Sequence, residues 1–230
     1  MKEWFEANIQ RMKWLMWDPD QLFLQLKAKS NWLFPLLVVM IGLPLIGMIF
    51  PHAATGFGTL GEYIEFYQKT AVETGVDPAE ASLTARYYTD IIMQGFGILM
   101  IWLFKSWMCG GLANAMDGEG ELKQAFSIVA WAYLPVAFSK MITLLTAGLF
   151  GTGLTFHLAS FLPATMQVSF LFLLLREVNL FVIWYQVLVI RGLRVVYGVE
   201  KKFAIFIGLV TWIAYIGMSV GFTILSWYQF

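Results

Sequence analysis

Five long apolar runs dominate this 230-residue chain, and they limit its possible folds more than any other feature. Residues 32–51 and 203–227 contain no charged residue, and residues 90–109 and 125–149 contain one lysine each. A helix needs roughly 20 apolar residues to cross the hydrocarbon core of a bilayer, so these four runs are long enough. The fifth run, residues 166–190, is interrupted by Arg176-Glu177. It predicts either one long tilted helix or a half-segment followed by a shorter span that starts near Asn179.

The composition indicates that most of the chain lies in lipid. Hydrophobic residues make up 59% of the sequence and charged residues 13%, against about 25% charged residues in a soluble domain. Mean hydropathy is +0.69. A chain of this size cannot hide so much apolar surface inside a globule. We therefore predict an all-α, polytopic membrane protein with five transmembrane helices, forming a single domain over residues 1–230. The net charge of zero argues against a nucleic-acid partner, because no basic surface exists to release counterions from phosphates.

The positions of Lys and Arg predict the orientation, since these residues accumulate in cytosolic segments. With the N-terminus inside, the inner segments hold ten of the 15 Lys and Arg residues: Lys2, Arg11, Lys13, Lys27, Lys29, Lys123, Arg191, Arg194, Lys201 and Lys202. The outer segments hold Lys69 and Arg86, with Arg176 near the boundary. We expect a cytosolic N-terminus, five crossings of the cell membrane and an extracytoplasmic C-terminus.

Residues 1–31 are predicted to form cytosolic or interfacial helices. A helix over residues 1–16 places Phe5, Ile9, Met12 and Met16 on one face, which is typical of a helix that lies in the membrane interface. The following Asp18-Pro19-Asp20-Gln21 combines an N-cap residue, a proline at the first helical position and a glutamine at the third. It predicts the start of a second short helix that leads into the first span.

Residues 52–89 are predicted to form an extracytoplasmic helical connection. An amphipathic stripe from Leu60 to Ala71 predicts one helix, and Asp77-Pro78-Ala79-Glu80 repeats the capping pattern. The helix that starts there is expected to continue into the second span. The pattern therefore favours an ordered helical hairpin at the outer face.

Signals for catalysis or metal binding are weak. His52 and His157 do not supply the three or four ligands of a metal site, and Cys109 is the single cysteine. The alternating acidic residues between Asp117 and Glu121 lack the glycine and distal glutamate of a calcium loop. No HExxH, GxSxG or Walker lysine motif is present. We expect no enzymatic activity, no cofactor and no metal.

Charges inside the spans are costly unless they pair or reach the interface. Lys105 lies near the inner end of its run and is predicted to snorkel. Lys140 and Glu177 are predicted to form an intramembrane charge pair, which would serve either as a substrate or proton site or as an ion pair locking two helices; we favour the structural role. In the last span, Gly217 and Gly221 form a GxxxG pattern that predicts close helix packing within this protein first and dimerisation second.

Three stretches together resemble the Yip domain of the Ypt/Rab-interacting protein family. The matching positions are Gly118, Gly120, Lys123, Gln124, Tyr133 and Pro135 in residues 110–135; Trp184, Leu188, Gly192, Leu193, Arg194, Tyr197, Gly198 and Ala204 in residues 184–204; and "DPDQLFLQL" from Asp18. The resemblance implies five helical spans with a cytosolic N-terminus. The chain lacks the long N-terminal region and the Asp-Leu-x-Gly-Pro motif of eukaryotic members. It looks like the bacterial short form, similar to the YknW-like proteins, which act as membrane accessories to ABC-type exporters.

The functional prediction combines the sparse polar chemistry with these amphipathic and loop surfaces. We expect a non-enzymatic membrane accessory or scaffold that organises another membrane complex, an ABC-type exporter of a toxic peptide or amphiphile, through its permease, ATPase or adaptor. The expected partner-binding residues are Phe5, Ile9, Met12, Asp117, Glu119, Lys123, Arg191, Arg194, Lys201 and Lys202. Two alternatives are a small transporter that uses Lys140 and Glu177, and a trafficking factor that binds a small GTPase.

Overall fold

The computed structural model describes residues 2–49, 64–65, 68–69, 80–151, 153–163, 166 and 169–227. Every regular element in this part of the chain is a helix, which confirms the predicted all-α class. The residues group into two compact units. Unit 1 comprises Met1–Leu36, Ile101–Val136 and Phe156–Phe230, and unit 2 comprises Leu37–Met100 and Ala137–Thr155.

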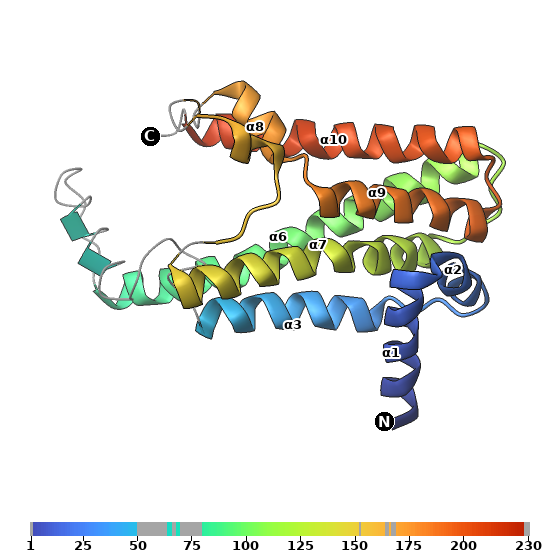
Figure 1. Cartoon of the computed structure of the whole chain (residues 1–230), viewed down its shortest axis with the longest axis horizontal. Coiled ribbons are helices and arrows are strands. Elements are labelled where there is room, and N and C mark those ends of the chain that lie inside the picture. Colours follow the sequence, from blue (N-terminus) through green and yellow to red (C-terminus); the bar gives the residue numbers. More distant parts are fainter. Residues whose placement is uncertain are drawn as a thin grey trace. The chain divides into compact units, whose positions relative to one another are not determined.

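The long helices follow the apolar runs. They are α3 (Leu33–Ile49), α6 (Glu80–Ala115), α7 (Leu122–Phe150), α9 (Leu180–Gly192) with its π-helical continuation η3 (Leu193–Tyr197), and α10 (Lys201–Trp227) (Figure 1). Among the described residues, four stretches of these helices are long and apolar enough to cross a membrane, and α3 makes a fifth if it forms one span with the helix before it. In each of these four stretches, at most 56% of the most apolar part is buried inside the protein. The rest requires a lipid environment, so the chain is a multi-pass membrane protein.

The fourth apolar run is split, as the second of the two sequence interpretations proposed. The short helix α8 (Phe170–Arg176) is capped by Ser169, whose side chain accepts from the Phe172 amide. A new helix, α9, then begins after Asn179, whose side-chain oxygen accepts from the Val182 amide at 2.8 Å. Between the two helices, Asn179 forms an isolated antiparallel β-bridge with His157. The span therefore begins at the Asn179 cap, and the charges of Arg176 and Glu177 stay outside α9.

Two helices precede the first span, as predicted. The helix α1 (Lys2–Trp17) is followed by α2 (Pro19–Ala28), and Asp18 caps α2 by accepting from the Gln21 amide at 3.3 Å. The α2 helix buries Leu22, Phe23 and Leu26. Figure 1 shows α1 running across the direction of α9 and α10, which is the orientation of a helix that lies along a membrane surface.

The outer connection is described only in part. Residues 64–65 and 68–69 are helical, whereas Leu60 and Ala71, which bound the predicted stripe, lie outside the described residues, as does His52. The α6 helix runs without a break from Glu80 to Ala115. The prediction that the second outer helix continues into the second span is therefore confirmed for this range.

Close helix contacts occur where glycine removes a side chain. In unit 1, a Cβ at Gly192 of α9 would lie 2.5 Å from Ile128 Cγ2 of α7 and 3.0 Å from Phe23 Cε1 of α2. In unit 2, a Cβ at Gly42 of α3 would lie 2.6 Å from Met141 Cε of α7. Small residues allow this approach in membrane helices. The contact at Gly192 places α2 against two of the spans.

Candidate functional site

One end of unit 1 brings together three segments that are far apart in the sequence. We call this region the turn end and define it as residues 18–32, 113–124 and 191–202. The sequence placed all three segments on the same side of the membrane. Their mutual contacts agree with that arrangement, because the Gln124 side chain donates to the Lys27 carbonyl at 2.9 Å and Arg191 lies 3.9 Å from Asp20.

Tyr197 links the α6–α7 turn to the end of α9. Its hydroxyl donates to the Glu121 carbonyl at 2.7 Å, and its own carbonyl accepts from the Glu119 amide at 2.9 Å. The ring leaves no room for a side chain at position 120, since a Cβ on Gly120 would overlap three ring carbons. The next residue, Gly198, takes a left-handed conformation with φ of 73°, which suits glycine. Two stretches 76 residues apart are thereby joined through one side chain.

The N-terminal helices are attached to α7 by a second set of hydrogen bonds. The indole of Trp131 donates to the Asn31 carbonyl at 2.6 Å, and the Asn31 side chain donates to Asn8 Oδ1 at 2.8 Å. Asn8 is fully buried and donates in turn to the Trp4 carbonyl at 2.8 Å. The ring of Phe34 stacks on Trp131 with centroids 5.6 Å apart. These contacts hold one face of α1 against the bundle.

The other face of α1 remains exposed. Phe5 is 55% exposed, Ile9 38% and Met16 53%, while Met12 is half-buried. The buried side of α1 is formed by Asn8 and Leu15 instead. The apolar stripe that the sequence singled out is therefore available to lipid or to a partner protein.

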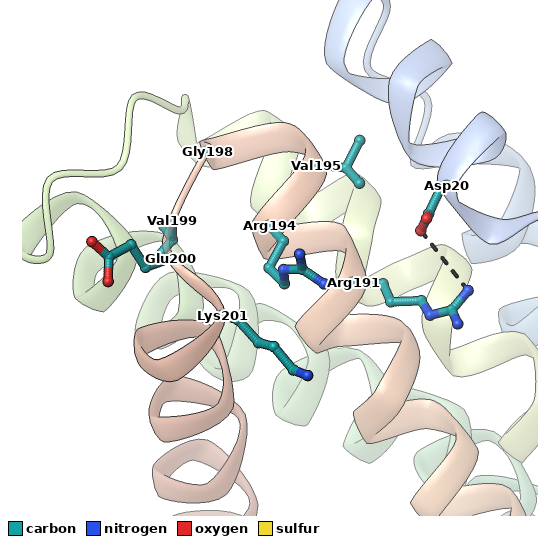
Figure 2. Close-up of a pocket in the computed structure, with 8 residues that line it drawn as sticks. All are labelled: Asp20, Arg191, Arg194, Val195, Gly198, Val199, Glu200 and Lys201. Carbon is teal, nitrogen blue, oxygen red and sulfur yellow. Dashed lines mark ion pairs between the residues drawn. The ribbon is translucent and has the colours of Figure 1, made fainter.

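The four cations of the α9–α10 connection do not act alike. Arg191, Arg194 and Lys201 line a pocket of about 310 Å³ together with two acidic residues, Asp20 and Glu200 (Figure 2). Lys202 lies beside this pocket and pairs with Glu200 at 2.8 Å. Three of the four cations therefore line the pocket, and the fourth, Lys202, is paired with Glu200.

The predicted residues of the α6–α7 turn are exposed. Asp117 has a positive φ of 60°, and Glu119 forms its backbone contact with Tyr197 described above. Lys123 pairs with Glu121 at 2.7 Å on the surface. Exposed pairs of this kind contribute little stability. Because all three predicted side chains are exposed, they are accessible at the turn end.

Lys105 is the residue whose role the sequence missed. The prediction that it snorkels to the interface is wrong, because the residue is 3% exposed. Its ammonium donates to Gln186 Oε1 at 3.2 Å and sits 4.0 Å from the centroid of the Tyr185 ring. Buried cations require partners of this kind. A signal was present in the sequence, since Gln186 is a polar residue inside an apolar run, but the pattern does not indicate which helices face each other.

Glu177, proposed as one half of an intramembrane charge pair, contacts two neighbours in unit 1. Its Oε1 accepts from the Ser219 hydroxyl at 2.9 Å and lies 3.6 Å from an Arg176 nitrogen. Lys140, the proposed other half, belongs to unit 2 and is exposed. The Lys140–Glu177 pair stays a prediction.

The two glycines of the GxxxG pattern in α10 do not pack closely against a described neighbour. A Cβ at Gly217 or Gly221 would meet nothing within 4 Å among the described residues, so their role in helix packing also stays a prediction. Within the described ranges, no three His, Cys, Asp or Glu residues gather to hold a metal ion. Cys109 is buried as a free thiol.

Several of the residues that carried the family resemblance lie at the turn end. Gly118 and Gly120 pack against the 197–199 segment, while Gln124 and Gly192 contact α2. No significant match was found among curated proteins or among solved structures. The family model described as the Yip1 domain matches residues 14–223, which include all three segments of the turn end. The chain belongs to the Yip1 domain family.

Proposed function

We propose that this Yip1-domain protein is a non-enzymatic accessory of the cell membrane that binds and organises another membrane complex. Its N-terminus would be cytosolic and its C-terminus extracytoplasmic, as the distribution of Lys and Arg favours. The partner would be an ABC-type exporter of a toxic peptide or amphiphile, contacted through its permease, ATPase or adaptor. The choice of an exporter rests on the resemblance to the YknW-like proteins.

The observation that carries the proposal is the two-sided construction of α1. One side is held to the bundle through Asn8, Asn31 and Trp131, whereas Phe5 and Ile9 on the other side are exposed. A helix that is fixed in place with its apolar side chains outward is preorganised, so binding costs little ordering entropy. The exposed turn residues Asp117, Lys123 and Arg191 lie at the same turn end of unit 1 and would add a polar rim to the contact.

Site-specific photo-crosslinking tests this proposal in the full chain. A photoreactive residue replaces Phe5 or Ile9 on the apolar face, and Gln10, which is exposed on another side of the same helix, provides the matched control. We expect crosslinks from positions 5 and 9, but not from 10, to subunits identified by mass spectrometry as an exporter permease, ATPase or adaptor. Recovery of the protein alone in mild detergent, with lipid adducts only, would contradict the accessory role and leave α1 as a membrane-surface helix.

A further inference from the structure

We propose that the pocket between the end of α9 and the start of α10 binds a phosphate-bearing anion. This inference does not depend on the exporter. The pocket measures about 310 Å³ and is lined by Arg191, Arg194 and Lys201 from the two helix ends, with Asp20 contributed by α2. A volume of about 300 Å³ is at the lower end of the range for small-molecule sites. Three cationic side chains around one cavity favour a ligand with several negative oxygens.

The two carboxylates that line the pocket do not neutralise it. Glu200 lies 2.8 Å from Lys202, and Figure 2 shows its carboxylate pointing away from Arg194 and Lys201. Asp20 faces Arg191 at 3.9 Å, which is a long, exposed pair. Arg194 and Lys201 form no ion pair with any residue that the structure describes. Two cations are therefore available to a ligand, and a third can be shared.

The backbone adds to the same preference. Lys201 is the first residue of the 27-residue helix α10, and the first-turn amides of a helix have no acceptor within it. The helix dipole also favours an anion at this end. Gly198 lines the pocket in its left-handed conformation. It reverses the chain so that the end of η3 and the start of α10 border the same space.

The position of the pocket admits two sources of phosphate. It lies at the junction of the candidate spans Leu180–Tyr197 and Lys201–Gly221, where lipid headgroups meet water. Basic residues at a membrane surface attract acidic phospholipids, so an acidic phospholipid headgroup is one source. A soluble phosphate ester from the aqueous side is the other. Both present negatively charged, non-bridging phosphate oxygens to Arg194 and Lys201.

The experiment measures ligand binding to the purified full chain in three variants. Arg194→Gln and Lys201→Gln remove pocket cations. Lys29→Gln is the matched control, because it removes the same charge from an exposed residue of the turn end that does not line the pocket. Each protein is mixed with vesicles containing phosphatidylglycerol or phosphatidylcholine alone, and separately with glycerol 3-phosphate. All three substituted residues are exposed, so the variants should fold normally. Binding of the unmodified protein to phosphatidylglycerol, with and without excess glycerol 3-phosphate, provides a reading that needs no variant.

We expect Arg194→Gln and Lys201→Gln each to weaken phosphatidylglycerol binding by about tenfold, the loss typical of a charge-assisted hydrogen bond, while Lys29→Gln changes it less than twofold. Competition by glycerol 3-phosphate with the same dependence on the variants would identify the soluble ester as a ligand of the same pocket. Equal losses in all three variants would mean unspecific surface attraction and would overturn the proposal. The absence of any preference for phosphatidylglycerol and of any glycerol 3-phosphate binding would overturn it as well.

Discussion

Lys105 in unit 1 and Lys140 in unit 2 both interrupt an apolar helix, but the protein accommodates them in opposite ways. Lys105 is 3% exposed and has Gln186 and Tyr185 as partners, whereas Lys140 is exposed. The hydrogen bonds of the two units differ similarly. In unit 1 three side-chain hydrogen bonds join residues 76 to 100 positions apart, while in unit 2 Thr143 donates to Leu154, 11 positions away. In unit 1, polar contacts between distant segments thus fix which helices and turns lie together, which apolar packing alone would not specify.

Replacing the partner of the buried lysine should have the largest effect. Gln186→Leu leaves the Lys105 ammonium without its amide acceptor, and we expect a loss of about 3 kcal/mol in the free energy of unfolding, because an unsatisfied buried charge is costly. Equilibrium unfolding in mixed micelles measures it. Lys140→Met is the control and should change stability by less than about 0.5 kcal/mol, as for other surface substitutions.

The double variant Lys105→Met/Gln186→Leu sharpens the same comparison. An apolar pair of similar volume should recover most of the stability lost in Gln186→Leu, since it removes the buried charge together with its partner. If the double variant is no more stable than the single one, packing at position 186 matters more than the charge. A large loss in Lys140→Met would instead favour the proposed pair with Glu177.

The glycines of the turn end should come next in size. Gly120→Ala forces a methyl group into the Tyr197 ring, and we expect a loss of about 2 kcal/mol from overpacking. Gly111→Ala is the control, because a Cβ there meets no described residue within 4 Å; its helix propensity predicts unchanged or slightly higher stability. Thermal unfolding in detergent distinguishes the two. Equal melting temperatures would show that the turn adapts without cost.

Removing one hydroxyl from each unit tests the difference in hydrogen bonding directly. Tyr197→Phe deletes the donor to the Glu121 carbonyl, which should cost about 1 kcal/mol. Thr143→Val deletes the donor to Leu154, an exposed contact, and should cost less than half as much because water can replace it. Amide hydrogen exchange of residues 118–121 provides a local reading. It should accelerate in Tyr197→Phe and remain unchanged in Thr143→Val.

The smallest effect is expected at the surface of the turn end. Asp20→Asn removes a long, exposed ion pair with Arg191, and such pairs contribute roughly 0–1 kcal/mol. We expect the free energy of unfolding to change by nearly zero in the same assay, with little dependence on salt. A loss above about 1 kcal/mol would mean that Asp20 holds α2 to the bundle, which the structure assigns to Phe23 and Gln124 instead.

Local features of the fold were readable from the sequence with good accuracy. The caps at Asp18 and Asn179 lie where helices α2 and α9 begin, and the five apolar runs correspond to the long helices. These features depend on residues close together in the chain, so composition and spacing suffice to predict them. The stripe of Phe5, Ile9 and Met16 was predicted as one outward helix face, and the three side chains are exposed.

The candidate site was only partly predictable. The sequence identified Arg191, Arg194 and Lys201 as a charged connection, yet it did not show that they enclose a pocket with Asp20. Likewise, Gly120 and Tyr197 both belong to the stretches that resemble the family, and their contact becomes visible only in three dimensions. Residues more than 70 positions apart meet according to how the helices pack, which spacing along the chain does not encode.

The sequence by itself determined that this chain is helical, that it resides in a bilayer and which stretches form most of its spans. Lipid accepts only backbone that satisfies its own hydrogen bonds, so long apolar runs must become helices. The tertiary structure alone decided which faces are buried, that Lys105 is enclosed by Gln186 and Tyr185, and that the α6–α7 turn meets the end of α9 at Tyr197. In a membrane protein the faces toward lipid and toward other helices are both apolar, so hydrophobicity cannot distinguish them, and the few polar side chains and glycines select the arrangement.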